Sequence, residues 1–357
     1  MPQQTRLPTY LITGLLGSGK TTTLRQLLQQ KPTHERWGII INEFGEVDID
    51  AATLQNQGSN DAVLSVSGGC VCCSAQHGLT HAINQLLLDS TTNPISRLLI
   101  EPTGLGHPAK IIDTLTRSTF LRPLALQPII CVMTPQQLTL ARWQKSAVMR
   151  DLVTLADVIL LNKIDLSSDA DIHQSLALLY KIYPPKLQIK KSQQGVIPLT
   201  DLSHLTCRNV KKKSNPFTIL SAQTGLSDHQ KQTAHVSTVV TSALPGVNQC
   251  VIQTQQNALL SIGWIFESQV QFNRIQLKVF FAEIAPLLSR AKGLLKTGNE
   301  WQLVNWSEGT LAFEDMAWRK DSRLELLFNE PQNTPVNSLE LLKVIENQLL
   351  NTISKIQ

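Results

Sequence analysis

The 357 residues are 42% hydrophobic and only 17% charged, and their formal net charge is +5. A chain of this length and apolar content buries a large core, so these values exclude disorder as the dominant state and allow two domains. No stretch approaches the roughly 18 consecutive apolar residues of a membrane-spanning helix, and the first residues lack the pattern of a secretory signal. We therefore expect a cytoplasmic protein without a membrane partner.

Cysteine and lysine clusters narrow the class of protein further. The six cysteines are too few for a secreted disulfide scaffold, and three of them crowd into residues 70–73, which indicates thiolate chemistry in a reducing compartment. The only run of basic residues is Lys211-Lys212-Lys213. Because no aromatic residues alternate with it, we expect no nucleic-acid partner.

Short apolar runs alternate with helical patterns in the first part of the chain. The apolar runs cover residues 10–13, 37–41, 98–100, 129–132 and 158–161. Helical spacing of leucines follows over residues 21–30 and 79–88. This alternation is typical of βαβ units, whose strands pair in parallel. It predicts an α/β domain over residues 1–210, with a mostly parallel sheet and helices on both faces.

The rest of the chain has a different pattern. Residues 211–258 are polar and interrupted by proline and glycine, which predicts an irregular connecting region. Residues 259–357 predict a smaller α+β domain with a helix over 274–284 and strands near 262–266, 291–296, 301–305, 311–314 and 324–328. A closing helix is expected to begin at a Ser338 cap. Its apolar stripe is expected to contain Leu339, Leu342, Leu349, Ile353 and Ile356.

A complete phosphate-loop motif follows the first apolar run: Gly14-Leu15-Leu16-Gly17-Ser18-Gly19-Lys20-Thr21. Its place between a strand and a helix is the context that the motif requires. The glycines let backbone N–H groups surround phosphates, and the helix dipole favours negative charge. Lys20 can reach the β and γ oxygens, and Thr21 is expected to hold Mg²⁺. The expected nucleotide contacts are Gly14, Gly17, Ser18, Gly19, Lys20, Thr21 and Thr22.

Two further segments extend the expected nucleotide site. Residues 98–100 form a buried strand that ends in Glu101, whose carboxylate can organise the water shell of Mg²⁺, and the amide of Gly104 can sense the γ-phosphate. Asn162-Lys163-Ile164-Asp165 follows another strand, where α/β folds bind ligands. Asp165 can accept hydrogen bonds from N1–H and the exocyclic amine of guanine, a pair that adenine does not offer. The tetrapeptide therefore favours GTP and GDP over ATP, although alone it could be an ordinary turn.

One more loop should contact the base, and two segments compete for this role. Ser221-Ala222-Gln223-Thr224 has the Ser-Ala pair that is common in GTPases, but it lies far beyond the last expected strand of the sheet. We therefore favour Ser192-Gln193-Gln194-Gly195.

A cysteine motif at residues 70–73 predicts a metal site. Cys70, Cys72 and Cys73 follow two glycines that permit a tight backbone course. Residues i and i+2 can direct two sulfurs to one ion, and Zn²⁺ prefers thiolates in tetrahedral geometry. Three thiolates leave an incomplete shell, which suits metal transfer better than permanent structure. The candidates for the remaining ligand are Glu43, Glu46, His77 and His107.

Each of these metal-binding interpretations has an alternative. Thiolates that bind metal also oxidise readily, so a redox role competes at the cysteine motif. His77 and His81 have a spacing that can bind metal but more often marks a polar helix face, and His107 could equally be an exposed loop residue. The isolated cysteines are expected to be small core or surface residues: Cys131, Cys207 and Cys250.

Together these motifs resemble, in order, those of the CobW-type P-loop GTPases, a family of metal chaperones and metallocentre insertases. The likeness rests on residues 14–22, 42–50, 68–73, 101–105 and 162–165, and later on 263–264 and 290–293. It covers nearly the whole chain. Residues 101–108 look most like the branch described as zinc-binding GTPases.

The resemblance implies hydrolysis of GTP with Mg²⁺, for which Lys20, Thr21 and Glu101 are the catalytic candidates. It also implies a transition metal on the cysteine motif, Zn²⁺ first and Co²⁺ or Ni²⁺ as alternatives, and transfer of that metal to a metalloprotein client. The block around Glu43 and Glu46 is expected to respond to the nucleotide. Because the chain lacks a histidine-rich tract, delivery of a single ion fits better than metal storage.

Rival classes of function stay open at this point. One is a GTP-binding zinc sensor or redox adaptor without productive metal transfer, and another is a P-loop kinase, against which Asn162 and Asp165 argue. No residue is an evident water-positioning glutamine, so we expect slow intrinsic turnover. The client and the oligomeric state, a homo-oligomer included, are not identified by the sequence.

Overall fold

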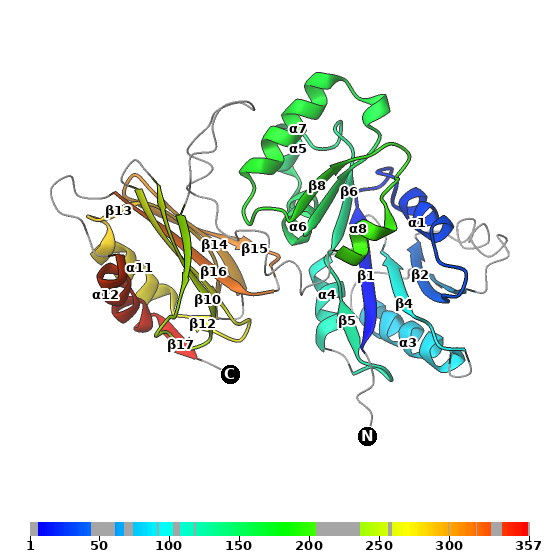
Figure 1. Ribbon diagram of the computed structural model, residues 1–357, viewed down its shortest axis with the longest axis horizontal. Helices are drawn as coiled ribbons and strands as arrows, with labels where there is room; N and C mark the ends of the chain where they lie inside the picture. Colours follow the sequence, from blue (N-terminus) through cyan, green and yellow to red (C-terminus); the bar gives the residue numbers. More distant parts are fainter. Residues whose placement is uncertain are drawn as a thin grey trace. The chain divides into compact units, whose positions relative to one another are not determined.

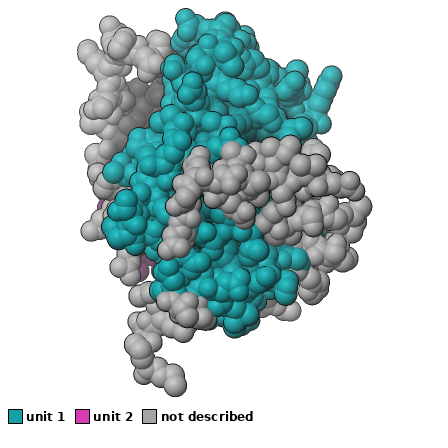
Figure 2. All heavy atoms as spheres, turned by 90° about the vertical axis from the view of Figure 1, so that its right-hand side faces the viewer, with its two compact units in different colours: residues 1–214 teal, residues 215–357 magenta. Residues whose placement is uncertain are grey.

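The computed structural model describes residues 6–43, 61–67, 74–90, 93–102, 108–117, 119–204, 236–255, 259–298, 300–318, 320–329 and 338–355. The chain forms two compact units, unit 1 from Met1 to Ser214 and unit 2 from Asn215 to Gln357. Figure 1 labels most of their helices and strands, and unit 1 is teal in the space-filling view of Figure 2.

Unit 1 is built on a parallel sheet. Its strands are β1 (Leu7–Gly14), β2 (Trp37–Glu43), β3 (Ala62–Ser67), β4 (Arg97–Glu101), β5 (Leu124–Leu126), β6 (Ile130–Met133), β7 (Val158–Leu161) and β8 (Gln188–Lys191). Their order is β3-β2-β4-β1-β6-β7-β8, with β5 also beside β1. Every pairing among these strands is parallel, which confirms the predicted sheet.

Helices cover both faces of this sheet (Figure 1). They are α1 (Lys20–Gln29), α3 (Ser74–Asp89), α4 (Pro108–Arg117), α5 (Leu140–Lys145), α6 (Ala147–Leu155), α7 (Asp169–Lys181) and α8 (Leu199–His204), with a short 3₁₀ helix η1 (Ile164–Leu166). Side chains alternate between the faces of a strand. On β7, Val158 and Leu160 join the core cluster that contains the apolar face of α1, whereas Ile159 and Leu161 join the cluster of α6 and α7.

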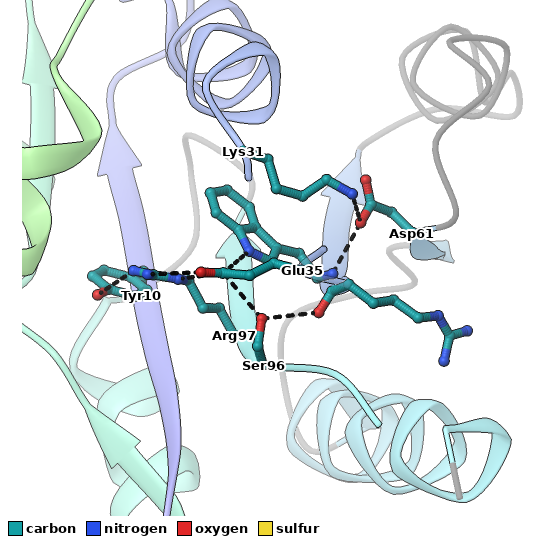
Figure 3. A network of polar contacts seen from close by, with 8 residues as sticks. Tyr10, Lys31, Glu35, Asp61, Ser96 and Arg97 are labelled. Carbon is teal, nitrogen blue, oxygen red and sulfur yellow. Dashed lines mark hydrogen bonds and ion pairs between the residues drawn. The ribbon is translucent and has the colours of Figure 1, made fainter. Parts of the chain in front are cut away.

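A polar network fastens the amino-terminal edge of the sheet (Figure 3). Glu35 Oε2 accepts hydrogen bonds from Arg97 Nε at 2.9 Å, Trp37 Nε1 at 2.6 Å and Ser96 Oγ at 3.1 Å. The Arg97 guanidinium also lies 5.5 Å from the centroid of the Trp37 ring. Burial alone would raise the pKa of Glu35, but the hydrogen bonds and the charge of Arg97 outweigh it and lower the pKa to about 2. The carboxylate therefore stays charged over the whole neutral range.

Asp61 connects the beginnings of β2 and β3 at the same edge (Figure 3). Its Oδ1 accepts hydrogen bonds from Lys31 Nζ at 2.7 Å and from the Trp37 backbone N–H at 2.9 Å. The register that follows pairs Gly38 with Ala62 and continues to the last residues of both strands. The carboxyl ends of β2 and β3 therefore lie side by side, at the other end of these strands from Asp61.

The described residues of unit 2 form a mostly antiparallel sheet, and α-helices lie on one of its faces (Figure 1). Its strands are β9 (Val236–Val240), β10 (Val247–Gln255), β11 (Leu259–Phe266), β12 (Gln271–Phe272), β13 (Leu288–Thr297), β14 (Glu300–Ser307), β15 (Thr310–Met316), β16 (Ser322–Asn329) and β17 (Ile353–Lys355). The order is β15-β14-β13-β16-β11-β10-β9, and β12 pairs with β13 and β17. Helices α11 (Arg274–Ile284) and α12 (Ser338–Leu350) pack on it through one hydrophobic core.

Unit 2 differs from the sequence-based expectation at its first strands and at its last helix. Part of the expected irregular region 211–258 forms strands β9 and β10, because polar side chains alternate there with core residues such as Cys250 and Ile252. The expected stripe on the last helix is also partly wrong. Leu339 is 51% exposed, and Ile353 lies in β17 because the helix ends at Leu350. Ile356 lies outside the described residues.

In the part of the chain that the structure describes, none of the helices has both the length and the apolar character needed to span a membrane.

Candidate functional site

Backbone geometry makes glycine necessary in the loop between β1 and α1. Gly14, Gly17 and Gly19 have φ angles of 146°, 74° and 102°, which residues with a side chain rarely adopt. A Cβ on Gly14 would lie 2.1 Å from the Val132 carbonyl oxygen, and one on Gly19 would lie 2.4 Å from Asn162 Nδ2. The glycines of the motif therefore serve both the backbone conformation and close packing.

Helix α1 begins directly after this loop, and the first N–H groups of a helix have no partner within the helix. Its N-cap residue is Gly19, which has no side chain to accept them, and its first turn, Lys20 to Thr23, contains no acidic residue. The helix dipole adds positive potential at the same point. The end of the loop is therefore suited to an anion such as phosphate.

Lys20 is a buried cation at this helix start. It is 7% exposed, and its Nζ donates to the Leu15 carbonyl oxygen at 3.2 Å. Burial lowers the pKa of Lys20, because a desolvated ammonium is disfavoured, and the negative charge of Glu101 offsets part of this effect. A buried ammonium beside a glycine loop is stabilised by an anionic ligand.

Thr21 and Glu101 meet at the carboxyl end of β4. Thr21 Oγ1 donates to Glu101 Oε1 at 2.9 Å, and Glu101 is 5% exposed. A hydroxyl and a carboxylate are oxygen ligands of the kind that Mg²⁺ prefers, directly or through its waters. The pair therefore fits a magnesium site beside the phosphate loop.

Asn162 joins two loops instead of facing the pocket alone. Its Nδ2 donates to the Ser18 carbonyl oxygen at 2.9 Å, and its Oδ1 accepts from the Gly195 N–H at 2.8 Å. The side chain is 1% exposed. Both halves of the amide are thus used to connect the phosphate loop with the loop after β8.

A pocket of about 380 Å³ lies next to these loops. Its lining residues come from α1, from the segment after β7 and from the loop after β8: Thr22, Gln26, Asn162, Lys163, Asp165, Leu166 and Gln194. Lys163 has a left-handed φ of 58°, which turns the chain from β7 into η1. Asp165 contributes a carboxylate to the lining of this pocket. A carboxylate can accept hydrogen bonds from a ring with adjacent donors, as guanine has.

The structure brings the Ser192–Gly195 loop to this pocket. Gln194 lines it, and Gly195 packs so tightly on α1 that a Cβ would lie 2.7 Å from Thr23 Oγ1. The competing segment Ser221–Thr224 lies outside the described residues.

Sequence reasoning missed two residues of the pocket, Gln26 and Leu166. Gln26 could have been found because it follows Thr22 by four residues on the same helix, and such residues share a face. Leu166 offered no comparable signal, because single exposed leucines are common on protein surfaces that bind no ligand.

Several expected site residues lie outside the described residues: Gly104, His107, Glu46, Cys70, Cys72 and Cys73. Of Glu43 and His77, only the backbone is described. The backbone of Glu43 pairs with Ser67, and Ile41 of the same strand pairs with Glu101. The expected nucleotide-responsive segment follows β2, and the cysteine segment follows β3. The carboxyl ends of both strands therefore lie on the same side of the sheet as the phosphate loop, which follows β1.

Within the described residues, no three His, Cys, Asp or Glu side chains gather as a metal site. Cys131 and Cys250 are buried, and burial raises the pKa of each thiol to about 12. Both therefore remain protonated and pack as small core residues, as the sequence predicts.

A glycine loop between a parallel strand and a helix, with a buried lysine and a threonine–carboxylate pair, defines a P-loop nucleotide-binding protein. Residues 8–190 match the family described as CobW/HypB/UreG, nucleotide-binding domain. The chain therefore belongs to the CobW/HypB/UreG family of P-loop GTPases, as its sequence motifs indicated.

Two curated relatives come from Escherichia coli strain K12. The chain is 30% identical to the zinc chaperone YeiR over 344 residues, which are 94% of this chain and 97% of the relative. It is 33% identical to the zinc chaperone YjiA over 178 residues, which are 47% of this chain and 52% of the relative. The crystal structure of the Zn(II)-bound YjiA GTPase from E. coli is similar over 96% of this chain and 99% of that one, with 18% identity and a TM-score of 0.42.

Proposed function

We propose that this chain is a zinc-binding GTPase that uses GTP hydrolysis to control the transfer of a metal ion to a client metalloprotein. The observation that carries the proposal is the parallel register of β3-β2-β4-β1. The phosphate loop continues from β1, and the cysteine segment continues from β3. Three strand spacings of about 4.8 Å separate the ends of β1 and β3, or about 14 Å, which suits communication through the segments between them.

At the nucleotide end, Lys20 would neutralise the β and γ oxygens of GTP, and the N–H groups of the glycine loop would bind the phosphates. Thr21 and Glu101 would hold Mg²⁺, which neutralises the charge that develops on the transferred phosphate. The amide of Gly104 would contact the γ-phosphate. The remaining phosphate contacts would come from Gly14, Gly17, Ser18, Gly19 and Thr22.

At the base end, Asp165 would accept the N1–H and exocyclic amine of guanine, while Asn162 and Lys163 shape the pocket. This pair of acceptors on one carboxylate supports GTP and GDP in preference to adenine nucleotides. It also argues against a P-loop kinase, many of which use ATP.

At the metal end, Cys70, Cys72 and Cys73 would bind the ion, with Glu43, Glu46 or His107 as the remaining ligand. Cys73 immediately precedes α3, and the positive end of a helix dipole favours the thiolate that metal binding requires. Zn²⁺ suits a thiolate-rich site, and the curated relatives named above are zinc chaperones. Co²⁺ and Ni²⁺ are the metals to test against it.

Coupling of the two ends would run through the segments that follow β2 and β4. GTP and Mg²⁺ order them and tighten the metal site, and hydrolysis loosens it. No glutamine is evident that would orient the attacking water, so intrinsic turnover is slow. Linkage requires that if GTP tightens zinc binding, zinc tightens GTP binding by the same factor.

Competitive zinc titrations test this proposal, with the protein bound either to GDP or to a non-hydrolysable GTP analogue. We expect the analogue to give the tighter zinc binding, and equal affinities would end the coupling claim. Cys72→Ala should weaken zinc binding while leaving GTP binding in the absence of zinc nearly intact, and Lys20→Ala should weaken GTP binding while leaving zinc binding in the absence of nucleotide nearly intact. Transfer is then tested by capture of partners on the GTP-locked, zinc-loaded protein and by metal analysis of the partner it loads.

A further inference from the structure

The turn after β6 contacts both ends of the proposed nucleotide site. It comprises residues 134–137, and the Gln137 N–H donates to the Thr134 carbonyl oxygen at 3.0 Å. Its two glutamine side chains reach different loops. We propose that Gln136 and Gln137 are positioning residues for the nucleotide, Gln137 for its phosphates and Gln136 for its base; this inference rests on the proposed function.

Gln137 holds a peptide group of the phosphate loop. Its Nε2 donates to the Leu16 carbonyl oxygen at 2.8 Å. Its Oε1 accepts from the Thr134 N–H at 3.3 Å, so the amide is oriented with its donor toward Leu16. In a trans peptide the carbonyl and the next N–H point in opposite directions. Gln137 therefore directs the Gly17 N–H to the opposite side, where the loop can bind an anion.

Asn162 acts on this loop in the same way. Its Nδ2 donates to the Ser18 carbonyl oxygen. Together with Gln137, it binds two carbonyl groups within three residues. An anion-binding loop needs its N–H groups directed inward, and groups that hold the carbonyls outward favour that conformation before the ligand arrives.

Gln136 supports the backbone behind Asp165. Its Nε2 donates to the Leu166 carbonyl oxygen at 2.6 Å and to Ser167 Oγ at 2.8 Å. Ser167 Oγ in turn donates to the Lys163 carbonyl oxygen at 2.8 Å. Leu166 and Lys163 line the same pocket as Asp165. The side chain of Gln136 thus fixes the turn that presents the carboxylate to the base.

A hydrogen bond from α7 also holds the turn in place. Ser175 is fully buried, and its Oγ lies 3.1 Å from the carbonyl oxygens of both Pro135 and Leu138. The glutamines therefore extend from a fixed support, and each can impose its geometry on the loop that it contacts.

Matched variants test the inference. Gln136→Met and Gln137→Met keep the side-chain length and remove the donors, and Gln144→Met on the exposed side of α5 is the control. Calorimetry on the full chain measures the affinities for GDP, GMP and inosine diphosphate. The preference for GDP over GMP reports phosphate binding. The preference for GDP over inosine diphosphate reports the contact of Asp165 with the exocyclic amine, which inosine lacks.

We expect Gln137→Met to reduce the preference for GDP over GMP by about 3- to 10-fold, the usual value of one hydrogen bond, and to leave the preference over inosine diphosphate unchanged. Gln136→Met should do the opposite, and Gln144→Met should change neither. Each variant should keep the melting temperature of the nucleotide-free protein.

Two results would overturn the inference while the proposed function stands: wild-type preferences in both variants, or a parallel fall of both preferences in each variant, which would indicate general loosening. A wild-type protein that binds no guanine nucleotide would overturn the proposed function, and this inference with it.

Discussion

Gly195 illustrates how closely the base loop packs on the helix of the phosphate loop. Its φ is +70°, and a Cβ there would lie 2.8 Å from the backbone N and 2.9 Å from the Cα of Thr23. Gly195→Ala should push the loop away from α1 and break its hydrogen bond to Asn162. We expect the free energy of unfolding to fall by about 2–3 kcal/mol and GDP affinity to fall with it, as measured by urea denaturation and calorimetry.

Gly309 is the matched control for this substitution. Its φ is +78°, but a Cβ at this position would have no neighbouring atom within 4 Å. Gly309→Ala should cost only the left-handed conformation, about 1 kcal/mol. Equal losses at the two positions would show that backbone conformation alone, and not contact with Thr23, decides the effect.

Residues whose role depends on local sequence were easier to predict than residues whose role depends on distant partners. The phosphate loop could be predicted from eight consecutive positions because its glycines and its lysine all lie in one short loop and act on the same phosphates. Asn162 was expected to belong to the nucleotide site, but its role as a connection between loops was not predictable. Its partners Ser18 and Gly195 are 144 and 33 residues away.

At the scale of elements, Glu35 fastens the segment before β2 to β4, and its pKa makes this contact depend on pH. The folded-state pKa is lowered from 4.5 to about 2. A carboxyl group with a lowered pKa stabilises the fold above its unfolded pKa and loses this contribution as pH falls toward the folded value. The network should therefore act fully at neutral pH and weaken between pH 4.5 and about 2.

Glu35→Gln tests this pH dependence. At pH 7 the variant should lose about 1–2 kcal/mol, because the contact is partly exposed and screened by solvent. The difference from the wild type should shrink as the pH falls below 4.5. Urea denaturation of both proteins across this range measures it, and a difference that stays constant with pH would contradict the assignment.

In unit 2, Glu346 connects α12 to the sheet. Its carboxylate accepts hydrogen bonds from Ser242 Oγ at 2.5 Å, the Ala243 N–H at 3.0 Å and Trp264 Nε1 at 3.0 Å. Glu346→Ala would leave the buried Trp264 N–H and two partly buried donors without this acceptor, so we expect a loss of about 3 kcal/mol or more. Chemical denaturation followed by tryptophan fluorescence measures it. Glu340→Ala, on the exposed side of the same helix, should cost well under half as much.

Most elements with strong apolar periodicity were predicted, but the apolar strand β3 and the polar strands were not. The helix expected over 274–284 is α11, with the same bounds and with Asn273 as its cap. Strand β8, Gln188–Lys191, was missed because three of its four residues are polar, and β9 was missed because serine and threonine interrupt its valines. In each case neighbouring strands provide the pairing that the local sequence does not indicate.

At the scale of the whole molecule, each unit has hydrophobic cores of its own. The core of unit 2 is centred on residues such as Trp264 and Phe280, and those of unit 1 lie on the two faces of the parallel sheet. A unit with its own core can unfold by itself. We therefore expect two thermal transitions for the full chain, one for each unit.

Nucleotide binding separates these transitions experimentally. GDP with Mg²⁺ at 100 times its dissociation constant should stabilise unit 1 by about 2.7 kcal/mol, which raises its melting temperature by about 5–10 °C. The melting temperature of unit 2 should not change. A ligand that binds only folded unit 1 does not stabilise the folded state of a unit that unfolds independently. Glu346→Ala should lower only the transition of unit 2, and Lys20→Ala should abolish the GDP shift of unit 1. A single transition that moves as a whole with GDP would mean instead that the units unfold together, so that nucleotide bound to unit 1 changes the stability of unit 2.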